Sequence, residues 1–341
     1  MNRFETKILQ QLLYSPTSYW SLLRNSDSPA PAFVQTIASL YSGGLIQSDE
    51  GRISLTQEGR RYAGILQPWE ELACPACHGQ TVVAKGSFQD LLLRFEQVSR
   101  GRPAAITDYD QGFILPQQTV ARALFLYSRG DLEGQSILLL GDDDLTSLAL
   151  ALTGLAKRIT VLEIDARLNQ FLREKKAAYG WDNLEVLDYD ARYPLSPELA
   201  GQFDVFFTDT VETIPGITLF LSRCVEGLRG EGSSGYFGQT RIECALAKWQ
   251  KIQSILISMN FAITDIVKDF HEYFLDPNGI LERGFRITEK APFDPGLPDV
   301  NFFISSLVRV EAVGTPHPLI TEPVNWERDL YYDEEMWITL D

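Results

Sequence analysis

The most regular hydrophobic pattern in the chain lies within residues 136–165. A strand-length apolar run at 137–140 ends at Gly141. From Leu145 onward, apolar residues recur with the spacing of a helix that has one buried face, and residues 159–164 form a second β-branched run. This order predicts two parallel strands joined by a right-handed crossover. Because ligands of open parallel sheets bind at the carboxyl ends of the strands, we expect the loop at Gly141 to line a binding site.

Similar runs extend this unit into one α/β domain. Strands are predicted at 184–187, 204–210, 232–239, 261–270, 286–288 and 302–311, and helices at 166–178, 215–227 and 241–259. Alternating strands and helices are typical of a parallel sheet covered by helices. We therefore predict a Rossmann-like catalytic domain of the class I methyltransferase type over residues 107–315.

A separate pattern occupies residues 1–66. Helical periodicity at 5–13, 18–23 and 31–41 is followed by a strand, a Glu-Gly turn, a second strand and a closing helix, which predicts a winged-helix-like domain. The third helix carries no Lys or Arg, although a DNA-reading helix should be strongly basic. A structural or dimerising role is therefore favoured over DNA binding.

Residues 67–106 are predicted to be a linker that contains a helix and a Cys-x-x-Cys motif. Cys74 and Cys77 are candidate metal ligands, because this spacing is half of a zinc-ribbon site. The other half is missing, since Cys224 and Cys244 stand alone in later segments. A zinc shared across a dimer axis, a redox pair and two reduced thiols without metal all stay open.

Charge and composition narrow the class of partner. The 341 residues carry a formal net charge of −16, which argues against nucleic acid and suits a polycationic small molecule. No apolar run approaches the length needed to span a bilayer, and the first residues lack a signal-peptide pattern. We expect a cytoplasmic protein without a membrane partner. The four cysteines do not suggest a disulfide scaffold.

The loop after the first strand of the sheet carries unusual chemistry. A dinucleotide-binding turn has further glycines that let the backbone approach a phosphate, but this loop has Asp142, Asp143 and Asp144. Three carboxylates repel phosphate and attract a sulfonium, an ammonium or a metal ion. A solvated helix cap is the alternative, although a cap needs one Asp rather than three.

Acids at the ends of the neighbouring strands complete a predicted nucleoside site. Glu163 lies where an acid commonly accepts a hydrogen bond from a ribose hydroxyl, and Asp165 follows it. After the third strand, Asp190 is the first candidate and Asp188 the second for the adenine amino group. Asp209 ends the fourth strand, where catalytic groups of parallel sheets lie.

Three stretches carry a resemblance to a known family. DYDQGFILPQQTVARALFL at 108–126, LLLGDDDLTSLALALTGLAKRITVLEID at 138–165 and the segment 203–241 closely resemble the branched-chain polyamine synthases, or N4-bis(aminopropyl)spermidine synthases. That resemblance implies transfer of aminopropyl groups from decarboxylated S-adenosylmethionine to a secondary amine of a polyamine. We expect a homodimer that requires no cofactor beyond this co-substrate.

The resemblance also implies where the reactants bind. Asp143, Asp144 and Asp209 are expected to be catalytic, and Gly141, Asp142, Glu163, Asp165, Asp188 and Asp190 to bind the donor. The expected acceptor-binding residues are Tyr109, Asp110, Gln111, Glu212, Glu272, Tyr331, Asp333, Glu334 and Glu335. The last four belong to an acidic tail, 316–341, which is predicted to be flexible. A disordered tail without function and a mobile lid over the acceptor both fit its composition.

One departure from the family pattern concerns the acceptor pocket. The family has Asp-Pro-Pro-Glu-Thr after the fourth strand, whereas this chain has Asp-Thr-Val-Glu-Thr at 209–213. The loop thereby gains two N–H groups and loses the rigidity of two prolines. Two other classes stay open: methyl transfer from S-adenosylmethionine to an amine, and a winged-helix regulator that senses polyamines without catalysis.

Overall fold

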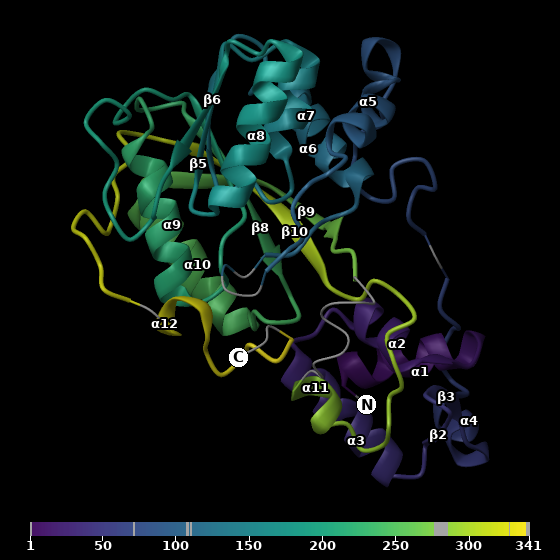
Figure 1. The fold of residues 1–341 in the computed structure, drawn as a ribbon. Helices are drawn as coiled ribbons and strands as arrows, with labels where there is room; N and C mark the ends of the chain where they lie inside the picture. The colour runs from purple at the N-terminus through teal and green to yellow at the C-terminus, as the bar shows by residue number, and fades with distance from the viewer. Residues whose placement is uncertain are drawn as a thin grey trace.

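The computed structural model describes residues 2–70, 72–106, 109, 111–275, 286–326 and 328–338. It consists of a seven-stranded sheet with helices on both faces and a helical N-terminal region below one end of the sheet (Figure 1). Within these residues no helix is long and apolar enough to cross a membrane. The predicted residue Asp110 lies outside the described residues.

The large sheet has the strand order β6-β5-β4-β7-β8-β10-β9. Its strands are β4 (Ser136–Leu140), β5 (Arg158–Glu163), β6 (Leu184–Asp188), β7 (Val205–Thr208), β8 (Ser234–Thr240), β9 (Phe261–Glu272) and β10 (Ile304–Ala312). The first five are parallel, and β10 runs antiparallel to β8 and β9. The chain therefore forms an α/β fold with a mostly parallel sheet. The chain order reverses at β4, so the loops after β4 and β7 diverge there and leave a crevice.

Two layers of helices cover the sheet because its strands are apolar on both faces. One face packs on α5 (Leu91–Val98), α6 (Pro116–Ser128), α7 (Thr146–Thr153) and α8 (Ala166–Tyr179). The other packs on α9 (Ile214–Glu226) and α10 (Leu246–Ser258). Along β4 the side chains alternate between the two cores: Leu139 joins the first and Leu138 the second.

The N-terminal region contains three helices, a hairpin and a short closing helix. These are α1 (Arg3–Tyr14), α2 (Tyr19–Ser26), α3 (Ala30–Ser42), β2 (Ile46–Asp49), β3 (Arg52–Leu55) and α4 (Gln57–Ala63), with β1 (Thr17–Ser18) paired to β3. Their core is not closed on itself, because it includes Ile242, Ile287, Phe302 and Ile338 from the rest of the chain. The N-terminal region is therefore packed onto the other part through shared apolar contacts.

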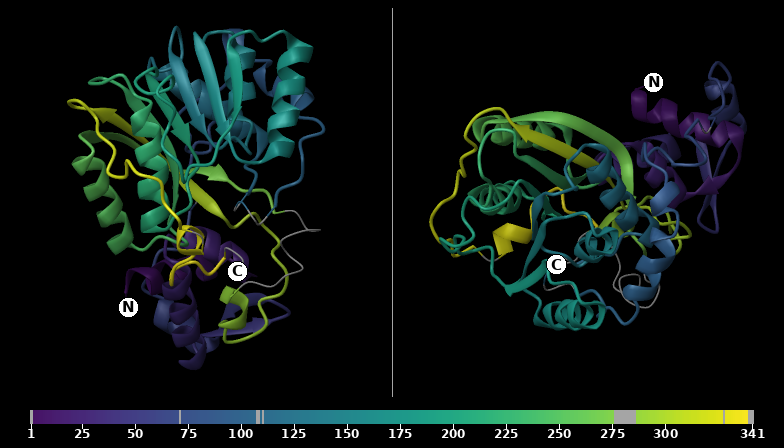
Figure 2. Two further views of the ribbon diagram at one scale, coloured as in Figure 1. Left: turned by 60° about the vertical axis from the view of Figure 1, so that its left-hand side comes forward. Right: turned by 90° about the horizontal axis from the view of Figure 1, so that it is seen from above.

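The remaining short elements join these parts. They are η1 (Gly86–Phe88), α11 (Arg286–Glu289) and α12 (Arg328–Tyr331). The strand predicted at 286–288 is wrong, because these residues form α11 and Ile287 turns into the N-terminal core. In two views the C-terminal segment runs past α9 toward the N-terminal region (Figure 2).

Candidate functional site

A cavity of about 750 Å³ opens at the carboxyl ends of the parallel strands. Residues after β4, β5, β6 and β7 line one side, and residues of the C-terminal segment line another. Of the predicted site residues, the lining includes Tyr109, Gln111, Gly141, Asp143, Glu163, Asp190, Asp209, Glu212 and Tyr331. Gly141 and Asp143 of the predicted loop thus lie in the wall of this cavity.

The first Asp of the loop serves the loop itself. Gly141 has φ +77° and begins a tight turn that a side chain would strain. Asp142 is buried, and its carboxyl oxygens accept hydrogen bonds from the N–H and the hydroxyl of Ser147 in α7. Burial raises the pKa of Asp142 to about 8. Asp142 therefore caps α7 from inside the protein and is absent from the cavity wall, as one alternative for this loop anticipated, although the cap is buried rather than solvated.

The other two loop carboxyls differ in their neighbours. Asp143 lines the cavity, and its oxygens accept the N–H groups of Gly112 at 3.2 Å and of Asp144 at 3.1 Å. Burial, followed by the charges of Asp144 and Asp209, raises the pKa of Asp143 well above its usual range. Asp144 is 1% exposed and accepts the N–H of Ile114 at 2.8 Å. Asp144 thus braces the loop before α6, and Asp143 faces the ligand space.

A buried arginine links these acids to Asp209. Arg122 Nη1 lies 2.9 Å from Asp144 Oδ2, and Arg122 Nη2 lies 2.8 Å from Asp209 Oδ2. Burial raises the pKa of Asp144 to about 6, although the positive charge of Arg122 opposes the rise. Sequence analysis did not single out Arg122. A lone Arg within the apolar stretch TVARALFL was the available signal, because a buried Arg almost always has an acidic partner.

Two residues of β9 and its end complete this cluster. Tyr273 lines the cavity, and its hydroxyl donates to the Asp209 carboxylate, with O···O distances of 3.2 and 3.3 Å. Burial raises the pKa of Tyr273 well above its usual range, so the hydroxyl keeps its proton. His271 accepts the Nε–H of Arg122 at 2.9 Å. The strand predicted at 261–270 ends just before both residues, and sequence analysis assigned neither of them a role.

The acids at the ends of β5 and β6 divide into cavity and non-cavity residues. Glu163 lines the cavity and accepts the N–H groups of Asp142 at 2.9 Å and Asp165 at 2.8 Å. Burial raises the pKa of Glu163. The Asp165 carboxylate is held by Arg167 at 2.6 Å and by Gln111 at 3.1 Å, and it lies outside the lining. Asp165 therefore anchors Gln111, which does line the cavity.

Of the two acids after β6, only Asp190 reaches the cavity. Asp190 is paired with Arg192 at 2.7 Å, and hydrogen bonds from Arg192 hold its pKa below the usual range against the effect of burial. Asp188 is exposed and pairs with Arg173 at 2.8 Å on the outer side. The geometry thus favours Asp190, the first of the two candidates.

A second acidic group lies where β7 and β8 end. Glu212 lines the cavity and accepts hydrogen bonds from the N–H and hydroxyl of Thr240. Burial raises the pKa of Glu212 to about 7. Glu243, which sequence analysis missed, is 1% exposed and also lines the cavity. The sequence feature that could have identified Glu243 is its position shortly after β8, a strand that ends at the cavity.

The C-terminal segment contacts the cavity with aromatic and apolar residues. Trp326, Leu330, Tyr331, Tyr332, Met336 and Ile338 line it. Leu330, Met336 and Ile338 are buried, and Thr213 donates to the Leu330 carbonyl at 2.6 Å. Within the predicted flexible tail, apolar side chains that stand among acids therefore pack against α9 and the N-terminal core.

The acidic residues of the tail lie elsewhere. Asp333 pairs with the buried Lys248 at 2.7 Å, and Glu335 accepts the N–H of Ala245 at 2.6 Å. Glu334 is exposed. These three are absent from the cavity lining, in contrast to the expectation that they face the acceptor. The charge of Lys248 draws two of them to α10 instead.

Glu272 also lies away from the cavity lining. Its carboxylate pairs with Arg24 of α2 at 2.7 Å and accepts from the Asn301 amide at 2.8 Å. Instead of the expected contact with the acceptor, Glu272 forms an ion pair that links the N-terminal region to the sheet. Because Arg24 belongs to a different predicted domain, local sequence could not show this pairing.

The Cys-x-x-Cys motif forms an exposed turn. Cys74 is exposed, Cys77 is half-buried, and both are free thiols. Hydrogen bonds from the Cys77 backbone lower the pKa of the Cys74 thiol. In the described part of the chain no group of three or more His, Cys, Asp or Glu residues is arranged to hold a metal ion.

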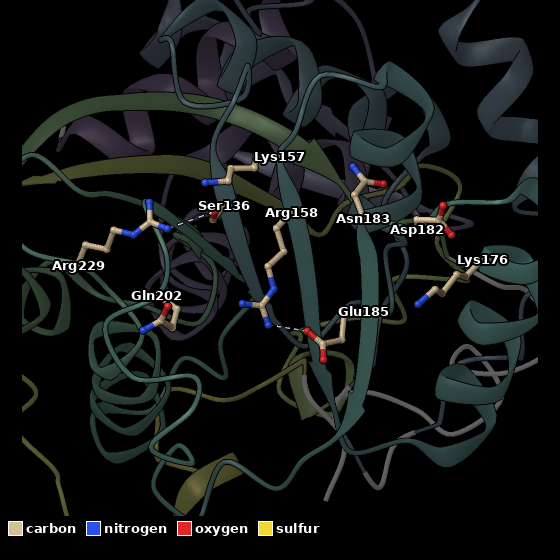
Figure 3. Close-up of a pocket in the computed structure, with 9 residues that line it drawn as sticks. All are labelled: Ser136, Lys157, Arg158, Lys176, Asp182, Asn183, Glu185, Gln202 and Arg229. Carbon is tan, nitrogen blue, oxygen red and sulfur yellow. Dashed lines mark hydrogen bonds and ion pairs between the residues drawn. The ribbon is translucent and has the colours of Figure 1, made fainter.

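A second hollow, of about 600 Å³, lies at the other end of the parallel strands, where they begin (Figure 3). Its lining includes Ser136 and Arg158, the first residues of β4 and β5. Arg158 pairs with Glu185 at 2.6 Å within it. Because this hollow lies at the amino ends of the strands, it is remote from the acidic loops, and the cavity described above is the candidate active site.

Comparisons with known proteins agree with this geometry. The family model for the C-terminal domain of branched-chain polyamine synthase A matches residues 90–338. The N(4)-bis(aminopropyl)spermidine synthase of Thermococcus kodakarensis is 40% identical over 321 residues, which are 93% of this chain and 89% of that protein. The enzyme of the same name from Methanocaldococcus jannaschii is 35% identical over 326 residues, which are 95% of this chain and 91% of that protein.

A solved structure is similar over nearly the whole chain. The crystal structure of the branched-chain polyamine synthase from Thermus thermophilus, in complex with N4-aminopropylspermidine and 5'-methylthioadenosine, has a TM-score of 0.84 and 32% identity. The match covers 98% of this chain and 92% of that one. A mutein of the same enzyme has a TM-score of 0.87 and 35% identity, and covers 98% of this chain and 93% of its own.

Proposed function

Because the chain belongs to the branched-chain polyamine synthase family, we propose that it transfers aminopropyl groups from decarboxylated S-adenosylmethionine to an amine of a polyamine. The product would be a branched-chain polyamine. The observation that carries the proposal is the cavity itself, where Asp143, Glu163, Asp209 and Glu212 converge at the carboxyl ends of the strands. Such a wall suits two cationic reactants, which would otherwise repel each other.

The transfer needs a group that takes a proton. In the reaction the donor's sulfur–carbon bond breaks, a nitrogen–carbon bond forms, and the attacking ammonium must first lose a proton, since its free pKa is about 10. The relative from Thermus thermophilus was crystallised with 5'-methylthioadenosine, which is the nucleoside that remains when an aminopropyl group leaves this donor. That complex supports the same donor for this chain.

Asp143 is the best-placed proton acceptor in this cavity. Its carboxyl faces the cavity, and burial with the charges of Asp144 and Asp209 raises its pKa, so this carboxylate takes up a proton more readily than a free one. Asp209 is held instead by Arg122 at 2.8 Å and by the Tyr273 hydroxyl at 3.2 Å, so its carboxylate oxygens are already engaged. We therefore assign Asp209 the role of holding and orienting the ammonium group, and Asp143 the proton transfer.

We assign the donor and the distal ammonium groups of the acceptor to different parts of the cavity. Glu163 would bind the ribose hydroxyls with its remaining lone pairs, and Asp190 the adenine amino group. Glu212 and Glu243 would hold ammonium groups further along the acceptor. The aromatic faces of the C-terminal segment, including Tyr331, would cover the same groups.

The N-terminal region is proposed to be a winged-helix-like domain with a structural role. Its third helix, α3, has buried apolar residues and no Lys or Arg, and α2 ties to Glu272 through Arg24. Assembly as a homodimer is part of this proposal. Size-exclusion chromatography with light scattering would test it, and a monomer at all concentrations would contradict it.

One experiment separates the proposed activity from its alternatives. The protein is incubated with decarboxylated or intact S-adenosylmethionine and a panel of polyamines, and the products are read by mass spectrometry. A mass gain of one or two aminopropyl units with the decarboxylated donor supports the proposal. A gain of one methyl from the intact donor would show a methyltransferase, and no product with any pair would contradict the proposed function.

A further inference from the structure

The side chain of Arg122 joins three separate elements beneath the cavity. It stands on α6 and is 1% exposed. Its Nη1 donates to the Thr146 hydroxyl at 3.0 Å and lies 2.9 Å from Asp144, while Nη2 lies 2.8 Å from Asp209. Its Nε donates to His271 at 2.9 Å. Each nitrogen of the planar guanidinium therefore points to a fixed partner.

The two acids that Arg122 bridges come from the loops that diverge at the crevice. Asp144 follows β4 and Asp209 follows β7. Two adjacent carboxylates in a buried site repel each other, and one of them is then forced to keep a proton. The guanidinium between them supplies the opposite charge. Because one of its nitrogens pairs with each carboxylate, it holds the two loops at a set separation.

The charged and titratable groups around the guanidinium come from every neighbouring element. Asp143 and Asp144 approach from the loop after β4, Asp209 from the loop after β7, and Tyr273 and His271 from β9 and its end. Arg102 adds a second positive charge close to Asp143 and Asp144. The ring of Phe207 lies under the guanidinium, with its centroid 4.7 Å from Cζ.

His271 is arranged to accept rather than donate at this site. Its side chain is fully buried, and burial together with the charge of Arg122 lowers its pKa well below the usual range. Because Nε2 accepts from Arg122, the proton of the neutral ring stands on Nδ1, which donates to Ser305 at 2.8 Å. Arg122 therefore sets the tautomer of His271, and Ser305 accepts the remaining ring proton and holds the ring beside the guanidinium.

We propose that Arg122 is a positioning residue for the transfer reaction, and that His271, held by Ser305, orients it. Arg122 holds the Asp209 carboxylate where it can meet the acceptor's ammonium, and its pairing with Asp144 keeps the loop bearing Asp143 in place. This inference rests on the proposed aminopropyl transfer. It concerns residues that touch no reactant and act through the two acids.

The test compares two substitutions of Arg122 that differ in charge. Arg122→Gln removes the positive charge that opposes the raised pKa values of Asp143 and Asp144, so the acidic limb of the pH profile of kcat/KM should move up by about one pH unit or more. Arg122→Lys keeps the charge but cannot bridge both acids and His271. It should lower kcat about 10- to 100-fold with a smaller shift of the limb and little change in the donor's KM.

Variants of His271 separate orientation from charge. His271→Phe removes the acceptor and should lower kcat about 10-fold without moving the acidic limb, because the neutral ring carries no charge. His271→Gln restores an acceptor oxygen and should recover most of that loss. A purely structural role would not produce this rescue.

Arg309→Lys is the matched control. Arg309 is a buried arginine of β10 that pairs with Asp131 at 2.8 Å, away from the cavity lining. The Arg309→Lys variant should have a lower melting temperature and an unchanged acidic limb of the pH profile. The inference is overturned if both Arg122 variants keep the wild-type limb and kcat, or if Arg309→Lys shifts the limb equally. If the Arg122 variants fail to fold, equal kcat values for His271→Phe and wild type overturn it.

Failure of the proposed function would look different. Wild-type protein would then form no aminopropylated product. The pH dependence of spermidine binding, measured by titration calorimetry, would still show whether Arg122→Gln raises the pKa of the acids. An unchanged pH dependence of binding would overturn the present inference in that case too.

Discussion

Binding of a polyamine should release a proton from Glu212. This carboxyl is fully buried, accepts two hydrogen bonds from Thr240 and has its pKa raised to about 7 by burial. An acid with that pKa is about half protonated at pH 7 and about nine-tenths protonated at pH 6. An ammonium group placed beside it favours the ionised form, so the proton leaves as the acceptor binds.

The size of the effect follows from the two protonation states. If the bound ammonium returns the pKa to about 4.5, binding releases about 0.5 proton at pH 7, about 0.9 at pH 6 and nearly none at pH 8.5. In the protein without ligand, the same protonation of Glu212 makes the free energy of unfolding depend on pH. Because the folded pKa is raised, Glu212 stabilises the fold fully below pH 4.5, and this contribution is lost as the pH rises through about 7.

Titration calorimetry measures the released protons directly. Spermidine is titrated into the protein in buffers that differ in ionisation enthalpy, and the slope of the observed enthalpy against that enthalpy counts the protons. Asp143 contributes protons as well, so the informative quantity is the difference between wild type and Glu212→Gln. Glu185→Gln, at the hollow where the parallel strands begin, is the control and should match wild type.

Two results would refute this reasoning. Equal proton release by wild type and Glu212→Gln from pH 6 to 8.5 would show that no ammonium group reaches Glu212. A release that grows with pH would show that a group other than an acid of this pKa titrates on binding. Either result would move the acceptor away from the end of β8.

Three further predictions concern the reaction and the tail. Asp143→Asn should lower kcat about 100- to 10,000-fold, with partial rescue at higher pH, and a larger loss in Asp209→Asn would place the base at Asp209 instead. Intact S-adenosylmethionine should bind at least about 100-fold more weakly than the decarboxylated donor, because its carboxylate approaches the acidic loop; equal affinities in calorimetry would contradict this. Truncation before Tyr331 should raise the acceptor's KM and lower the melting temperature by about 5 °C or more, whereas an unchanged melting curve would show that the tail contacts add nothing.

Much of the sheet could be predicted from local sequence. Buried parallel strands are continuous apolar runs, so β4, β5 and β7 were visible, and the glycine after β4 marked the turn. Loops at the carboxyl ends of such strands meet at one edge, which brought Asp143, Glu163 and Asp209 together in the prediction. The family pattern added the nature of the reaction.

Other predictions failed because acids look alike in sequence. Asp142 and Asp143 are neighbours, yet one caps α7 and the other faces the cavity. Asp188 and Asp190 are separated by one residue, yet Asp188 pairs with Arg173 and only Asp190 lines the cavity. Which way a loop carboxyl turns depends on donors supplied by distant segments, such as Ile114 for Asp144.

The sequence by itself determined most strands of the sheet and the acidic character of the loops after them, because these follow from hydrophobic periodicity and local turn chemistry. Only the tertiary structure decided the partners of those acids. Arg122 meets Asp209 across 87 positions of sequence, and Lys248 meets Asp333 across the packed tail. A buried charge has to find an opposite charge wherever the fold brings one near, and that pairing leaves no periodic trace in the chain.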